Sequence, residues 1–267
     1  MTSSPVLADR TALWVPLVRR LTREFPNWTI WKNADAAFAG SGDIDSAAPA
    51  SDWDGIVLAF RQWAKELGLG PVVECRHPPR TMFLIALDQS RSTFLELDVL
   101  GRKYFRGGTL FRAEELLSLC GLDERGFRAV RPAAQGFILL LCNGLGWGGR
   151  QNQAALRKRR VVELFQRDLD GVRDAARCLH LPLGAAAAAV EALLSGSWHR
   201  RSLLMIEGAA LFRALLEPRV IAERAWFRAV SKRCCPVLRS VFYGARVIPE
   251  DPKTWLHDVR RTHRVYE

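Results

Sequence analysis

The chain has 267 residues, 49% of them hydrophobic and 25% charged, which is ordinary for one large globular domain or two modest ones. No apolar run reaches the ~18 to 20 residues of a membrane span, and the first ten residues lack the order of a signal peptide, so we expect a cytoplasmic protein without a membrane partner. The 39 Lys and Arg against 28 Asp and Glu give a formal charge of +11.

That positive charge favours a polyanionic partner such as RNA. An Arg-rich, Lys-poor and Ala-rich chain is also produced by coding bias, so the charge alone leaves both explanations open. The six cysteines contain no pair at two-residue spacing, which fits neither a zinc site nor a disulfide framework. We expect them to be reduced and mostly buried: Cys75, Cys120, Cys142, Cys178, Cys234 and Cys235.

The first ~110 residues alternate between helical and strand-like patterns. Apolar residues at helical spacing predict helices over 7–25 and, after the capping chemistry of Ser51, to about residue 67. Small residues over 34–42 predict a connection. Short β-like runs predict five strands, with a hairpin turn at 88–90 between the last two: 28–31, 43–47, 72–76, 82–87 and 93–100.

After Thr109 the pattern is nearly all helical. We expect helices over 111–119, 132–145, 154–179, 185–194, 202–216 and 220 to about 243. The predicted fold is therefore α+β: a small mixed β-sheet core with flanking helices, followed by an α-helical domain. We place the boundary between Gly121 and Pro132, which gives domains of residues 1–125 and 126–267.

Two acids flank one aliphatic residue in the strand-like stretch Gly40-Ser41-Gly42-Asp43-Ile44-Asp45. Strand side chains alternate, so Asp43 and Asp45 share one face while Ile44 points into the core. Two carboxylates so placed are able to hold a pair of Mg²⁺ (or Mn²⁺) ions ~3.5 to 4 Å apart, as in-line phosphoryl displacement requires.

A second acidic strand face follows at Phe94 to Leu100, where alternation puts Glu96 and Asp98 on one side. An acid within so apolar a strand is costly unless something pairs with it, and a metal ion would do so. We assign Asp98 as the third metal ligand, which also helps to activate an acceptor hydroxyl, with Glu96 as the substitute.

These motifs resemble the polymerase-β-like nucleotidyltransferase superfamily, in which a Gly-Ser pair, an Asp-x-Asp strand, a helix and a hairpin with one more Asp recur. Within it the chain is most similar to small bacterial nucleotidyltransferases with a helical C-terminal part, over residues ~10 to 165. The resemblance implies that Asp43, Asp45 and Asp98 bind divalent metal and are catalytic. It implies transfer of an NMP group from an NTP to an acceptor, with release of pyrophosphate.

The chain departs from this family in its triphosphate contacts. The family's Gly-Ser pair sits at a helix start about ten residues before the acids, where this chain has Trp31-Lys32-Asn33 instead. We therefore expect Lys32 to supply a direct charge, and Gly40, Ser41 and Gly42 to let the chain approach a phosphate closely. Arg102 and Lys103, which follow Asp98, are candidates for phosphate contact.

Other motifs do not favour a different enzyme class. The glycines at 144–149 follow a Leu-rich run and fit a helix end better than a dinucleotide-binding turn, and no Walker sequence is present. The acceptor stays open among RNA, slightly favoured by the charge, protein and small molecules. The alternative function is a catalytically silent nucleotide- or RNA-binding module of the same fold.

Overall fold

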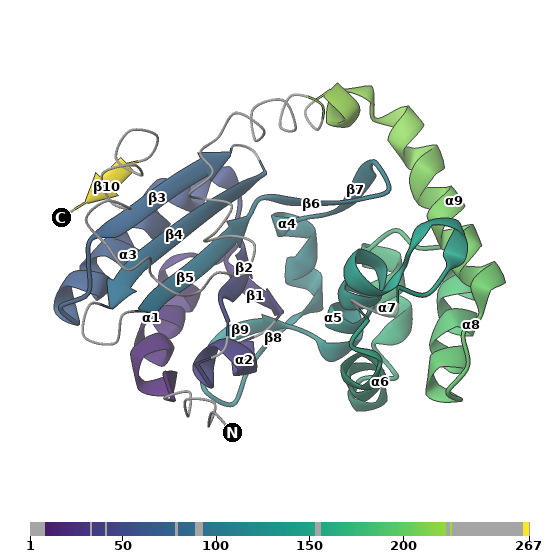
Figure 1. Cartoon of the computed structure of the whole chain (residues 1–267), viewed down its shortest axis with the longest axis horizontal. Coiled ribbons are helices and arrows are strands. Elements are labelled where there is room, and N and C mark those ends of the chain that lie inside the picture. The colour runs from purple at the N-terminus through teal and green to yellow at the C-terminus, as the bar shows by residue number, and fades with distance from the viewer. Residues whose placement is uncertain are drawn as a thin grey trace, which may run out of the picture. The chain divides into compact units, whose positions relative to one another are not determined.

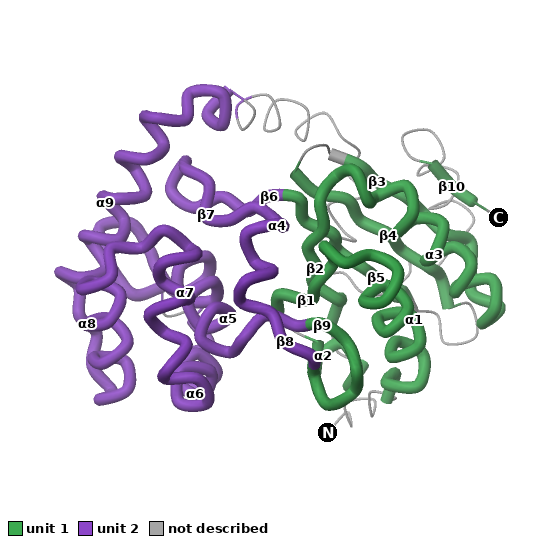
Figure 2. The backbone as a smooth tube through the Cα atoms, turned by 180° about the vertical axis from the view of Figure 1, so that it is seen from behind, with its two compact units in different colours: residues 1–101, 123–128, 227–267 green, residues 102–122, 129–226 purple. Residues whose placement is uncertain are grey.

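The computed structural model describes residues 9–32, 34–40, 42–77, 80–88, 93–152, 156–222, 225 and 264–266. Helices and strands are mixed within them, so the α+β prediction is confirmed (Figure 1). The chain divides into two compact units, residues 1–101, 123–128 and 227–267 in the first and residues 102–122 and 129–226 in the second (Figure 2). Instead of one boundary at 125/126, the backbone passes between the units four times.

Two helices of the first unit bury their apolar stripes against each other. Helix α1 (Thr11–Glu24) buries residues at the i, i+3, i+4, i+7 spacing, and it ends at Phe25, which is extended because a proline follows. Helix α3 (Trp53–Glu66) follows a 3-10 turn over residues 50–52. The rings of Trp14 and Trp63 stack across α1 and α3 with centroids 5.1 Å apart.

The sheet of this unit runs in the order β10-β3-β4-β5-β2-β1. Strands β2 and β5 are parallel, and the other neighbouring pairs with a determined register are antiparallel. The parallel pair of β2 and β5 places two strands far apart in sequence side by side. The strands are β1 (Thr29–Lys32), β2 (Ile44–Ala47), β3 (Val72–His77), β4 (Thr81–Asp88), β5 (Thr93–Leu100) and β10 (Arg264–Tyr266).

The two faces of the sheet differ in what covers them. Arg76 on β3 pairs with Asp54 of α3 at 2.6 Å, so its face is the helix-covered one. In register, Arg76 opposes Met82 and Met82 opposes Val99, which places the buried side chain of Val99 on the same face. Asp98 alternates with Val99 and therefore lies on the face opposite to α3.

The second unit begins with a hairpin and continues with helices. Strands β6 (Arg102–Phe105) and β7 (Gly108–Arg112) pair antiparallel, and the turn at Arg106 and Gly107 has positive φ at both residues, 49° and 107°. Primed hairpin turns require this backbone. Five of its helices are α5 (Pro132–Leu139), α6 (Lys158–Arg167), α7 (Val172–Cys178), α8 (Leu183–Leu194) and α9 (Arg200–Leu216).

Short elements complete the described chain. They are α2 (Ala34–Phe38), β8 (Cys120–Leu122), β9 (Arg128–Val130), α4 (Ala113–Leu116), a 3-10 turn over Leu117–Leu119, a π-helical turn over Leu140–Gly144 and a 3-10 turn over Trp147–Gly149. Helix α2 replaces the connection predicted over 34–42. Phe38 at its end packs edge-on against Phe127, with ring centroids 5.6 Å apart, and this tertiary contact was not readable from local sequence.

The helix predicted over 154–179 is wrong as one element, because α6 and α7 are separate. Asp168, at the break, accepts hydrogen bonds from Arg131 and from the backbone N–H of Ala133 in the first turn of α5. Because its side chain accepts these hydrogen bonds, Asp168 adopts a non-helical backbone with φ of −150°, and α6 ends there.

The helix predicted over 111–119 is also wrong at its start, where β7 continues to Arg112. Residues 89 and 90 of the predicted hairpin turn, and most of the helix predicted over 220–243, lie outside the described residues. Among the residues described, no helix is both long and apolar enough to cross a membrane.

Candidate metal centre

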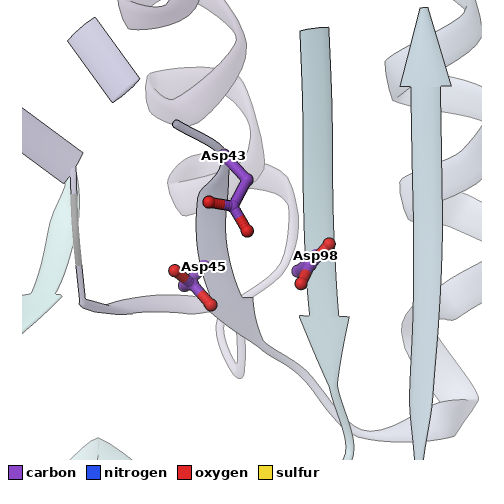
Figure 3. A group of neighbouring side chains, drawn as sticks. All are labelled: Asp43, Asp45 and Asp98. Carbon is purple, nitrogen blue, oxygen red and sulfur yellow. The ribbon is translucent and has the colours of Figure 1, made fainter. Parts of the chain in front are cut away.

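The parallel pair β2 and β5 brings together acids that are more than fifty positions apart. Asp45 opposes Asp98 in register, while Ile44 opposes Leu97 with both side chains fully buried. Paired residues in a sheet point to the same face, so the two carboxylates are neighbours on the side away from α3. Figure 3 shows Asp43, just before β2, turned toward the same space.

The carboxylates of Asp43, Asp45 and Asp98 each offer an oxygen within 4.8 Å of the others. Asp45 is buried, and the other two are half-buried. Strand alternation predicts a shared face for Asp43 and Asp45, and the resemblance implies that Asp98 joins them; the three carboxylates lie together in the structure. Glu96, named as a substitute for Asp98, is not in this group, although its charge raises the pKa of Asp98 more than the charges of Asp45 and Asp43 do.

The environment of Asp98 is unfavourable for an isolated carboxylate. Burial is the main cause that raises its pKa well above the usual value, and the charges of Glu96, Asp45 and Asp43 raise it further. Its Oδ1 atom is buried and receives no hydrogen bond within the described part of the chain. A carboxylate oxygen that is buried without a hydrogen bond loses the free energy of its hydration and gains no interaction in return. A bound cation would supply that interaction.

Lys32 places a positive charge beside the acids. It opposes Asp45 in the antiparallel β1–β2 register, and its Nζ lies 3.0 Å from Oδ1 of Asp45. Burial by itself lowers the pKa of Lys32, but the attraction of Asp45, with smaller contributions from Asp43 and Asp98, leaves that pKa raised. Lys32 therefore stays charged and offsets one negative charge of the group.

This ion pair is the part of the site that the sequence interpretation missed. The sequence predicts contact of Lys32 with the triphosphate alone, a prediction that takes no account of the pairing of β1 with β2. A signal was present: Lys32 ends a strand that is followed by a short connection and then by the acidic strand. Two such strands pair antiparallel, which puts their facing ends side by side.

The structure bears differently on the other residues that were predicted to contact the nucleotide. Gly40 and Gly42 have φ of 83° and 139°, a backbone that favours glycine, so the turn into β2 explains both residues without a ligand. Ser41 between them lies outside the described residues. Arg102 and Lys103 are on β6 in the second unit. Phosphate contact by these residues stays a prediction.

The donor set matches a hard divalent cation. Three carboxylates supply oxygen ligands and no sulfur or imidazole, which suits Mg²⁺ or Mn²⁺ better than zinc. The unpartnered Oδ1 of Asp98 is an acceptor position of the kind that such an ion fills. A separate cavity of about 630 Å³ in the first unit, lined by Arg61, Lys65 and Tyr266 among others, includes none of the three aspartates.

Comparison of the chain with protein-family models, with curated proteins and with solved structures finds no match.

Proposed function

We propose that the chain is a metal-dependent nucleotidyltransferase, which moves an NMP group from an NTP to an acceptor and releases pyrophosphate. The observation that carries this proposal is the convergence of Asp43, Asp45 and Asp98 within 4.8 Å of one another on one sheet face. The resemblance in sequence names the same three residues. The fit of the donor set to Mg²⁺ or Mn²⁺ supports both.

The three aspartates would hold the divalent ions, which supply charge stabilisation to the attacking and leaving oxygens when bound. Asp98 lies beside the acceptor position in this proposal and orients the acceptor hydroxyl. Lys32 holds the carboxylate of Asp45 in place through the 3.0 Å ion pair, so that the ligand geometry exists before the nucleotide arrives. The rigid β2–β5 register keeps Asp45 and Asp98 at constant separation.

The acceptor is proposed on charge alone. A formal net charge of +11 favours a polyanion, so RNA is the first acceptor to test, before protein and small molecules. Binding that depends on this charge weakens steeply as the salt concentration rises. Retention of an RNA acceptor at high salt would count against this part of the proposal.

The direct test is label transfer. The protein is incubated with Mg²⁺, each α-labelled NTP and total RNA, and then with protein and small-molecule acceptors. The proposal expects transfer by the parent and its loss in Asp43→Asn, Asp45→Asn and Asp98→Asn. Asp54→Asn is the control, because this acid is exposed on α3 and forms a surface ion pair. Transfer that survives in all three variants contradicts the proposal.

A second candidate is a binding module without turnover, and the ion pair of Lys32 favours it. This lysine neutralises part of the acidic group without any metal, as a purely structural network would. The two candidates differ in one outcome. A silent module binds RNA or nucleotide equally in the parent and in Asp45→Asn and transfers no label, whereas the enzyme loses transfer in that variant.

A further inference from the structure

The cavity of about 630 Å³ in the first unit is lined by the exposed side of α3, by the connection from α3 to β3 and by the edge of the sheet. Four of its lining residues stand at positions i, i+3, i+4 and i+7 of α3, a spacing that puts them on one stripe of the helix. They are Leu58, Arg61, Gln62 and Lys65. The helix therefore directs a mixed apolar and cationic stripe at this cavity.

The edge of the sheet gives the cavity an apolar wall. Tyr266 of β10 opposes Val72 of β3 in register, and both residues line the cavity; Figure 1 shows β10 beside β3. The Tyr266 hydroxyl donates to the buried carboxylate of Glu74 at 2.5 Å, which leaves the aromatic ring to serve as a wall. Leu69, in the connection that precedes β3, continues this wall.

Arg61 and Lys65 bring two positive charges to the cavity, one turn of α3 apart. The guanidinium of Arg61 lies 3.8 Å from the ring centroid of Tyr266, and this contact holds it at the wall. Within the part of the chain that the structure describes, no carboxylate pairs with either cation, and none of the lining residues is an acid. Both charges are therefore open to neutralisation by an anionic ligand.

The donors at the cavity match a phosphate group. Oε1 of Gln62 accepts a hydrogen bond from Arg20 at 2.8 Å, which orients the amide and leaves its N–H groups to donate. The fork of Arg61 suits two phosphate oxygens, and Lys65 adds a point charge. A phosphate monoester carries a charge of about −1.5 to −2 at neutral pH, close to that of two cations with opposite sign.

The size and the apolar wall of the cavity indicate the rest of the ligand. Cavities of roughly 300–1,000 Å³ take ligands of the size of a small organic molecule. A bare phosphate would leave most of this volume empty and the wall of Leu69, Val72 and Tyr266 uncovered. An apolar or aromatic body attached to the phosphate would cover that wall.

We propose that this cavity binds a small phosphate monoester with an apolar or aromatic body. The phosphate lies between Arg61 and Lys65, and the body packs against Leu58 and Leu69. The site is separate from the metal centre, because α3 covers one face of the sheet and the three aspartates lie on the other. It uses no residue of the proposed transferase reaction, so the two proposals fail independently.

The first test titrates the full chain by calorimetry with 1-naphthyl phosphate, 1-naphthol and inorganic phosphate, at low salt and in EDTA. EDTA prevents phosphate from binding through a metal ion at the aspartates. We expect 1-naphthyl phosphate to bind at one site, at least about tenfold tighter than either of its parts, because only the ester fills both portions of the cavity. Equal affinity for 1-naphthol or for singly charged 1-naphthoate would overturn the proposal, as would no binding of 1-naphthyl phosphate at about 1 mM.

The second test separates the charges from the apolar wall. Arg61→Gln and Lys65→Gln should each weaken the binding of 1-naphthyl phosphate and of inorganic phosphate about tenfold, because each removes a charge-assisted contact. Leu58→Ser should weaken 1-naphthyl phosphate alone, since Leu58 contacts the body of the ligand. Arg23→Gln, 75% exposed at the end of α1, is the matched control, and Asp98→Asn controls for the metal centre. Both controls should bind like the parent.

Circular dichroism melts confirm that each variant is folded. Lys65→Gln is the most informative of them, because the Lys65 side chain forms no ion pair or hydrogen bond within the described residues that the change would remove. Affinity for 1-naphthyl phosphate that is unchanged in Lys65→Gln, or lost in Asp98→Asn, would overturn the proposal.

Discussion

The three aspartates of the metal centre, in the first unit, have different surroundings from two buried acids of the second unit. In the second unit, Glu207 faces Arg106 at 2.5 Å and also accepts the backbone N–H of Gly149 at 2.9 Å, and Asp168 has an arginine and an N–H in the same way. In the first unit three carboxylates gather, and the Lys32 ammonium reaches Asp45. Acids with a dedicated cation and donor hold a fold together, whereas a gathered group leaves charge for a ligand to neutralise.

The largest expected effect comes from Glu207. We expect Glu207→Gln to lower the free energy of unfolding by about 3 kcal/mol, because it leaves the mostly buried guanidinium of Arg106 without its counter-charge. Urea denaturation measures the loss, and Glu191→Gln on the exposed side of α8 is the matched control. Equal stability of the two variants would show that the acids of the second unit are not structural and would remove the contrast.

Replacing Lys32 should change the stability by an intermediate amount, because its partner Asp45 is both ion-paired and a member of the metal centre. In metal-free buffer, Lys32→Met should cost about 2 kcal/mol, because buried Asp45 loses its counter-ion. Added Mn²⁺ should then stabilise this variant more than it stabilises the parent, since the ion replaces the missing charge. Thermal unfolding with and without Mn²⁺ tests this, with exposed Lys65→Met as the control. A smaller metal response in the variant than in the parent would mean that Lys32 assists metal binding.

Asp98 gives the smallest change in stability, and its sign is opposite to that of Glu207. The pKa of Asp98 is raised in the folded protein by burial and by Glu96, so the folded state holds this proton more tightly than the unfolded chain. Its contribution is present at low pH and is lost as the pH rises from the unfolded pKa toward the folded pKa. At neutral pH and without metal, Asp98→Asn should therefore gain about 1 kcal/mol.

The pH profile checks that sign. Urea unfolding in EDTA, from about pH 4 upward, should show the parent losing stability relative to Asp98→Asn as Asp98 ionises. Parallel profiles would indicate that Asp98 is ionised without cost and that the site has no excess charge to neutralise.

Strand alternation was sufficient to predict which acids share a face, because it depends only on neighbouring residues. The resemblance implied that Asp98 joins Asp43 and Asp45, but the parallel pairing of β2 with β5 that places Asp45 opposite Asp98 was not predicted. Features set by distant partners were not recoverable. Asp168 breaks a helical pattern to reach Arg131, and the β6–β7 hairpin turns on Arg106, a residue that rarely adopts positive φ.

The central claim is that Asp43, Asp45 and Asp98 together hold a divalent cation, and calorimetric titration of the metal-free protein with Mn²⁺ tests it most directly. We predict binding by the parent and by Asp54→Asn with the same affinity, and a loss of at least about tenfold in each of the three aspartate variants. Absence of Mn²⁺ binding by the parent, or equal binding by Asp98→Asn, would contradict the account.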